Sequence, residues 1–183
     1  LGADYNINFA DDSQFQFISI NNQLDADTLR DRYRVFEDDS VLQDLSLRNK
    51  SVNTERIYRG VYTRPVTEGH NLELGLERAQ TTLATQLELS RLNPATAEFV
   101  EVAVPNALSE IEEIRYEGFV VHHWQLNPRM KLESTLLYEY SEIAQSGDVN
   151  KKRDFSFVKP KVDLRFDMTP TIQLRGTIEK RVQ

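Results

Sequence analysis

The chain has 183 residues, a length typical of one domain, and a formal net charge of −7 at pH 7. The acidic balance disfavours a nucleic-acid-binding surface, because phosphate recognition needs clustered lysine and arginine. There is no cysteine, which excludes disulfides and thiolate chemistry, and no apolar run of 18 residues that would form a transmembrane helix. Only 39 % of the residues are hydrophobic, yet the chain holds seven tyrosines and nine phenylalanines. A sheet that is apolar on one face and polar on the other accounts for both facts.

Strict alternation of apolar and polar residues is the strongest pattern and predicts β-strands. Near the start, residues 5–9, 14–20 and 57–63 alternate weakly. In the middle, leucines at 72, 74 and 76 alternate with Glu73, Gly75 and Glu77, and a second leucine series follows at 83, 87 and 89. The alternation is clearest in four later segments, residues 115–126, 131–141, 161–168 and 172–179. We therefore predict an all-β fold, an antiparallel up-and-down meander of about eight long strands that forms a barrel or a section of a barrel wall.

The predicted connections alternate between short and long. Residues 10–12, 64–70, 126–129 and 169–170 are short turns, whereas residues 24–50, 93–109 and 146–153 are long. Outer-membrane barrels have this layout, with short periplasmic turns and longer extracellular loops. Many of the strands reach about ten residues, and a tilted strand needs ~9–11 residues to cross a membrane. Residues 25–36 are compatible with a small helix capped by Asp27 or with a flexible charged loop.

Candidate catalytic and metal-binding residues form no convincing constellation. His122 and His123 are neighbours on a strand, so they point to opposite faces and do not chelate one ion together, and His70 lies far along the chain. The carboxylates alternate with basic residues and are most simply explained as cross-strand partners. We predict no catalytic, cofactor-binding or metal site, no cofactor and no enzymatic activity.

The polar face of the predicted strands is the face expected to line a lumen. In each alternating segment, its charged members occupy the polar positions. They are Glu73, Glu77, Glu117, Glu133, Glu139, Asp163, Arg165, Asp167, Arg175 and Glu179. The leucine-rich face would meet lipid. Trp124 falls near a short turn, where an interfacial aromatic belt would place it, although an ordinary core tryptophan explains it equally well.

Several strings resemble the barrel of TonB-dependent outer-membrane receptors. The first is TER at 54–56, which leads to GHNLELGLE at 69–77. The later strings are HWQLNP at 123–128, LYEYSEI at 137–143, QSGD at 145–148, RDFSFVKP at 153–160 and LR at 174–175. The resemblance covers most of the chain from about residue 46 onward. It implies an import receptor in the bacterial outer membrane, with a 22-stranded barrel, an N-terminal plug and energy supplied through TonB.

The chain departs from the whole receptor pattern. It shows no TonB box and no plug domain, and it has too few strands to close a 22-stranded barrel. We therefore expect residues 1–183 to be one barrel region of a larger receptor, which contacts outer-membrane lipid and meets TonB only through the absent plug. The imported nutrient, an iron chelate, a cobalamin or an oligosaccharide, is not indicated, and no ligand-binding residue is carried over. Open edges predict that the fragment self-associates.

The alternative is a soluble all-β binding module. In that case the leucine-rich face would line the core or a lipophilic pocket of a closed eight-stranded barrel. The two hypotheses differ in whether the apolar face is covered within the chain itself.

Overall fold

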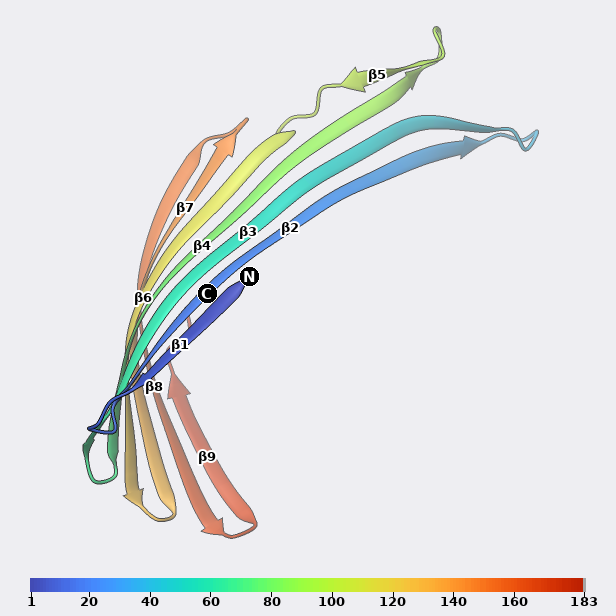
Figure 1. Cartoon of the computed structure of the whole chain (residues 1–183). Helices are drawn as coiled ribbons and strands as arrows, with labels where there is room; N and C mark the ends of the chain where they lie inside the picture. The colour runs from blue at the N-terminus through green and yellow to red at the C-terminus, as the bar shows by residue number, and fades with distance from the viewer. Residues whose placement is uncertain (183) are drawn as a thin grey trace.

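The chain forms one continuous antiparallel sheet, shown in Figure 1. The computed structural model describes residues 1–182. Its strands are β1 (Gly2–Asn8), β2 (Gln14–Val35), β3 (Val41–Thr67), β4 (His70–Asn93), β5 (Glu98–Val102), β6 (Leu108–Asn127), β7 (Met130–Gly147), β8 (Lys151–Thr169) and β9 (Ile172–Glu179). Residues 1–182 contain no helix long and apolar enough to cross a membrane.

Each long strand pairs with the next long strand along the chain. The order in the sheet is β1-β2-β3-β4-β6-β7-β8-β9, and the short β5 folds back on the upper part of β4. Within the described residues β1 and β9 do not pair with each other, so both edges of the sheet are open. This confirms the predicted antiparallel meander. The closed eight-stranded barrel of the alternative hypothesis is wrong, because a closed barrel needs its first and last strands to pair.

The short turns gather at one end of the sheet and the long hairpins at the other, as Figure 1 shows. Three of the four short turns have two residues between their strands, and the turn between β1 and β2 has five. Gly69 adopts a φ of 75° in the turn between β3 and β4, a conformation that favours glycine. At the long end, β2, β3 and β4 sweep well beyond β6 and β7 (Figure 1). The four predicted short turns and the long connection at residues 93–109 are confirmed, whereas the longer connection predicted at residues 146–153 is wrong, because only residues 148–150 join β7 to β8.

A second exception is the long loop predicted at residues 24–50. β2 and β3 instead continue as a paired hairpin, and only Phe36 to Ser40 connect them. The helix considered for residues 25–36 is wrong for the same reason, since those residues pair with β3 through Val35. The cause is that both faces of this hairpin mix polar and apolar residues. The strands of this hairpin are specified by backbone hydrogen bonds between them. An alternation of apolar and polar residues does not reveal them.

A small packed cluster lies where β3, β4 and β6 meet. Val61, Ala79 and Phe119 are its buried hydrophobic residues. Phe119 lies opposite Gly75 in the register, and a Cβ atom added at Gly75 would collide with the Phe119 ring. The Arg59 guanidinium sits over the same ring, 5.0 Å from its centre. Even in this cluster, and everywhere else in residues 1–182, no large side chain is fully buried, because a single layer covers neither of its faces.

Candidate functional site

The register divides the side chains of the sheet between two faces. Residues directly opposite on neighbouring strands share a face, and the face alternates along each strand. Glu77 pairs with Glu117 and Arg59, so these three lie together on what we call the Glu77 face. Leu74 pairs with Val120 and Tyr62 on the opposite side, which we call the Leu74 face.

In the short-turn half of the sheet the Leu74 face is a continuous apolar band. It crosses all of the long strands from β1 to β9. Its members are Tyr5, Ile7, Phe15, Phe17, Tyr62, Leu72, Leu74, Leu76, Val120, Leu132, Leu136, Val158, Val162, Leu164, Phe166, Leu174 and Ile178. Many of these side chains are open to the surroundings; Leu76 is 74 % exposed and Ile178 is 80 % exposed. A soluble domain rarely leaves so large an apolar surface uncovered.

Amphipathic rings mark both boundaries of the apolar band. On the long-hairpin side, Tyr58, Tyr116 and Tyr140 lie in one row of the register, and the Arg78 guanidinium lies 6.0 Å from the Tyr116 ring centre. On the short-turn side, the rings of His70 and Trp124 stack with 5.2 Å between their centres. Tyrosine and tryptophan collect at membrane–water interfaces, where one end of the ring is wet.

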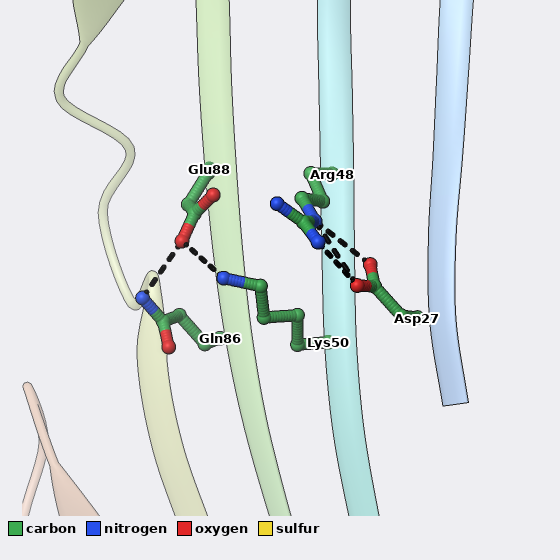
Figure 2. Close-up of polar contacts among 5 residues, drawn as sticks. All are labelled: Asp27, Arg48, Lys50, Gln86 and Glu88. Carbon is green, nitrogen blue, oxygen red and sulfur yellow. Dashed lines mark hydrogen bonds and ion pairs between the residues drawn. The ribbon is translucent and has the colours of Figure 1, made fainter. Parts of the chain in front are cut away.

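Beyond the tyrosine row the Leu74 face becomes charged. Figure 2 shows this stretch, in which Arg48 and Lys50 of β3 reach to the neighbouring strands. The Arg48 Nε donates to Asp27 Oδ1 of β2 at 2.9 Å, and the Lys50 Nζ lies 3.0 Å from Glu88 Oε1 of β4. The hydrogen bond from Arg48 holds the pKa of Asp27 below its usual value. These ion pairs are typical of a surface in contact with water.

The Glu77 face changes in the opposite sense at the same level. It is charged beside the apolar band, and beyond the tyrosine row it carries aliphatic side chains on β3, β4 and β6. These are Leu45, Leu47, Leu83, Leu87, Leu89 and Ile111. The polarity of both faces therefore inverts along the strands. β3 has 27 residues, whereas ~9–11 are enough for a tilted strand to cross a membrane. The apolar band is thus one zone of the sheet, and the long hairpins form a second zone beyond it.

All ten charged residues predicted from the sequence to share a polar face do lie on the Glu77 face. Glu77, Glu117 and Glu139 occupy one row. Arg115 bridges two of them, with Nη2 3.3 Å from Glu77 and Nε 3.1 Å from Glu117. Lys159 of β8 pairs with Glu139. The register therefore assembles a cross-strand network of alternating charge.

A second group of the predicted residues surrounds a polar hollow of about 410 Å³ near the short turns. Arg175 Nε lies 2.9 Å from Asp163 Oδ2, and Arg165 Nη2 lies 3.3 Å from Asp167 Oδ2. Glu133 also lines the hollow and faces Lys161 at 3.5 Å, whereas Asp167 is held by Arg165 outside the lining. Glu73 and Glu179 share the face but join neither group; within residues 1–182, Glu179 forms an ion pair with Arg181 alone. Whether this face lines a lumen stays a prediction.

The three histidines separate as the strand pattern predicts, with one exception. His122 and His123 lie on opposite faces, and His123 Nδ1 is 3.6 Å from Glu133. The expectation that His70 lies far from the others is wrong, because the pairing of β4 with β6 brings its Nδ1 to 3.0 Å from His122 Nε2. Within the described residues no group of three or more metal-ligating side chains forms.

One charged cluster was not foreseen from the sequence. Arg32, Arg34 and Asp44 meet near the far end of the β2–β3 hairpin, and Arg91 of β4 lines the same hollow as Arg34 and Asp44. The repeated arginines at 30, 32 and 34 were a signal, but residues 24–50 were interpreted as a loop. Without a paired strand at this position, no face could be assigned to them.

The chain was compared with known families, curated proteins and solved structures. No family model and no curated protein matches it. Among solved structures, the copper transporter OprC aligns with a TM-score of 0.70 and 14 % identity over 97 % of this chain. The ferric citrate transporter FecA in its unliganded form aligns with 0.62 and 10 % identity over 91 %. The chain therefore shares its fold with part of each of these two proteins.

The similarity lies in the fold and extends over only a part of each neighbour. The chain spans 29 % of the copper transporter and 24 % of the ferric citrate transporter. The alcaligin outer-membrane receptor FauA from Bordetella pertussis aligns with a lower TM-score of 0.48, at 11 % identity, over 90 % of this chain and 31 % of its own. The fold predicted from alternation, a section of wall formed by an antiparallel meander, is confirmed.

Proposed function

We propose that residues 1–183 form part of the wall of a TonB-dependent receptor barrel in the bacterial outer membrane. The apolar band of the Leu74 face carries this proposal. It crosses the whole sheet, it is exposed, and aromatic rings bound it on both sides. A barrel wall in lipid needs this arrangement, in which an outward apolar zone is flanked by aromatic girdles.

The Glu77 face then lines the interior of the barrel. Its charges are paired across strands, which suits a polar interior that touches water or another polar surface. The short turns face the periplasm, and the paired hairpins of β2, β3 and β4 project outside the cell. In this receptor a plug domain would contact the Glu77 face and TonB would act through the plug.

The imported compound is a scarce nutrient. The two fold neighbours that align well are named as transporters of copper and of ferric citrate. Their names favour a metal or a metal chelate over the other nutrient classes, cobalamins and oligosaccharides. The role is binding and passage, without catalysis or a cofactor, because the charged side chains of the Glu77 face are engaged mainly with one another.

A soluble binding module is the competing function. It would require the apolar band to be covered, and within residues 1–182 no second layer covers it. In water the isolated chain would therefore be expected to self-associate through this band or through its open edges.

A scan of single cysteines along β4 tests the proposed wall. The chain has no native cysteine, so a nitroxide can be placed at one position at a time. Positions 72, 74 and 76 lie in the apolar band and positions 82, 86 and 88 lie beyond the tyrosine row, all on the Leu74 face. In bilayers we expect oxygen, which dissolves in lipid, to relax the first three labels more strongly. A water-soluble nickel chelate should relax the labels at positions 82, 86 and 88 more strongly.

Glu73 and Glu77 provide matched controls on the opposite face of the same strand. Labels there should be less accessible to oxygen than those at 72, 74 and 76. Equal accessibility to the nickel chelate at all six positions of the Leu74 face would show that β4 lies in water along its length, and the proposed wall would be wrong.

A further inference from the structure

A hollow of about 410 Å³ lies at the far end of the long hairpins, between the tip of β2–β3 and the β4–β5 hairpin. We call it the tip hollow. Arg34 and Asp44 line it from one hairpin and Arg91 from the other, and aliphatic side chains complete its wall. These are Leu42, Val100 and Val102. Its volume lies within the ~300–1,000 Å³ of small-ligand sites.

A β-bulge places the carboxylate of this hollow. The register of β2 with β3 shifts between Arg32 and Tyr33, and Asp44 is the extra residue on β3. Bulges re-aim side chains, and Asp44 here lies between two arginines of the facing strand. The Asp44 side chain is only 13 % exposed, whereas the side chains of Arg32 and Arg34 are 58 % and 59 % exposed.

The charges within the tip hollow do not balance. Arg32 occupies both oxygens of Asp44, with Nε and Nη2 each at 2.8 Å. Arg34 gives only its Nη2 to the same carboxylate, at 3.0 Å, which fixes the guanidinium and leaves its other donors free of side-chain partners among the described residues. Arg91 forms no ion pair within residues 1–182. On the same face Arg30 and Glu98 add one charge of each sign. The hollow itself is therefore lined by two arginines against one carboxylate, and the β2–β3 turn beyond it adds the carboxylates of Glu37, Asp38 and Asp39.

From this geometry we infer that the tip hollow binds a small oxyanion that carries carboxylate or phosphate groups. Arg34 and Arg91 supply planar pairs of N–H donors, which match the oxygens of either group. Asp44 acts as a positioning residue, since it holds Arg34 while Arg32 neutralises its charge. Leu42, Val100 and Val102 give the hollow one apolar side, although each of them is itself exposed.

The tip hollow also fits the place where a receptor first meets its cargo. Because the hairpin tip lies at the outer mouth only if the proposed wall is correct, this role in uptake rests on the proposed function. The cargo class would then be an anionic small molecule or an anionic metal chelate. The chain as a whole has a net charge of −7, whereas the lining of the tip hollow carries two arginines and one carboxylate, which favours an anion inside the hollow.

Calorimetric titration of the full chain in detergent micelles tests the inference. The probes are tricarballylate, a small tricarboxylate, and pyrophosphate. We expect at least one of them to bind, and Arg34→Gln and Arg91→Gln each to weaken that binding tenfold or more. Tighter binding of tricarballylate would assign a carboxylate ligand, and tighter binding of pyrophosphate would assign a phosphate.

Arg56→Gln is the matched control, because Arg56 is an exposed arginine on the Leu74 face of β3 and forms no ion pair within residues 1–182. It should change the affinity less than twofold. Binding of neither probe, or an equal loss with Arg56→Gln, would overturn the site.

Should a glutamine variant lose its β-sheet circular dichroism, Arg91→Lys replaces it and is expected to bind more weakly, since lysine lacks the planar pair of donors. The nitroxide scan of β4 is independent, so failure of the tip hollow and failure of the wall are distinguishable.

Discussion

Phe119 occupies the space that a side chain at position 75 would need. The two residues face each other across β4 and β6, and the ring lies against the glycine backbone with Arg59 above it. This contact is part of the small buried cluster on the Glu77 face. A glycine in the interior of a strand weakens that strand unless something covers it, and here the aromatic ring provides the cover.

We expect Gly75→Ala to destabilise the folded chain by about 1–3 kcal/mol, because the added methyl group forces the Phe119 ring to move. Guanidinium unfolding in detergent measures the change. Gly176→Ala is the control, since a Cβ atom at Gly176 meets no atom within 4 Å. Equal unfolding midpoints for the two variants would show that the Gly75–Phe119 contact is not tight.

Asp44 should make the hairpin tip sensitive to acid. Hydrogen bonds from Arg32 lower the pKa of Asp44 below its ordinary 3.8. A carboxyl group with a lowered pKa stabilises the folded state above its unfolded pKa, and this contribution is lost as the pH falls through the lowered value. A nitroxide at position 37 in the tip should therefore be immobile at pH 7 and become mobile only below about pH 4.

With Asp44→Asn the same label should be mobile at pH 7 as well as at low pH. Asp31→Asn serves as the comparison, because Asp31 pairs with Ser46 in the register and forms no ion pair within the described part of the chain. A tip that stays immobile in the Asp44 variant at pH 7 would mean that the arginine–aspartate pairs do not hold the hairpin together.

At the scale of a strand, β4 shows how the apolar residues change from one face of the sheet to the other. Its leucines lie on the Leu74 face at 72, 74 and 76 and on the Glu77 face at 83, 87 and 89. The sequence itself shows the leucines changing from even to odd positions along β4. The change occurs at the row of Tyr58 and Tyr116. One strand thus passes from a zone with an apolar outer surface to a zone with a charged outer surface.

Leu74→Arg should impair membrane insertion, since an arginine at the middle of a lipid-facing band costs ~2–4 kcal/mol. Thr82→Arg is the matched control on the same face of the same strand, beyond the tyrosine row. We expect it to cost less than ~1 kcal/mol. Folding titrations into bilayers measure both, and equal costs would contradict the boundary placed at Tyr58 and Tyr116.

The strands could be predicted wherever one face is apolar, since period-two alternation then reports the burial directly. This holds for residues 115–126 and 172–179, and it also placed all ten charged residues on one face. It failed for the upper part of β2, where both faces mix polar and apolar residues and the backbone pairing with β3 specifies the strand. The tip hollow was missed because it depends on a bulge at Asp44 and on contacts between hairpins far apart in the sequence.

At the scale of the whole molecule, the open edges should govern behaviour in water. β1 covers only the first part of β2, and β9 only the lower part of β8. The outer edge of the remaining backbone of β2 and β8 therefore has no strand beside it within residues 1–182. We expect the isolated chain to form oligomers in plain buffer and to become monomeric in mild detergent. Size-exclusion chromatography with light scattering distinguishes these states. A monomer in plain buffer would show that the edges and the apolar band are satisfied within one chain.

The most direct test of the barrel wall uses Trp124, the one tryptophan of the chain, which stacks on His70 at the short-turn boundary of the apolar band. Its fluorescence should be measured in bilayers whose lipids carry bromine at defined depths. A lipid-facing tryptophan at the interface predicts strong quenching by bromines near the headgroup, weaker quenching by bromines near the chain ends, and protection from acrylamide in the water. Full quenching by acrylamide with no effect of any brominated lipid would place Trp124 in water and contradict the assignment of this face to the membrane.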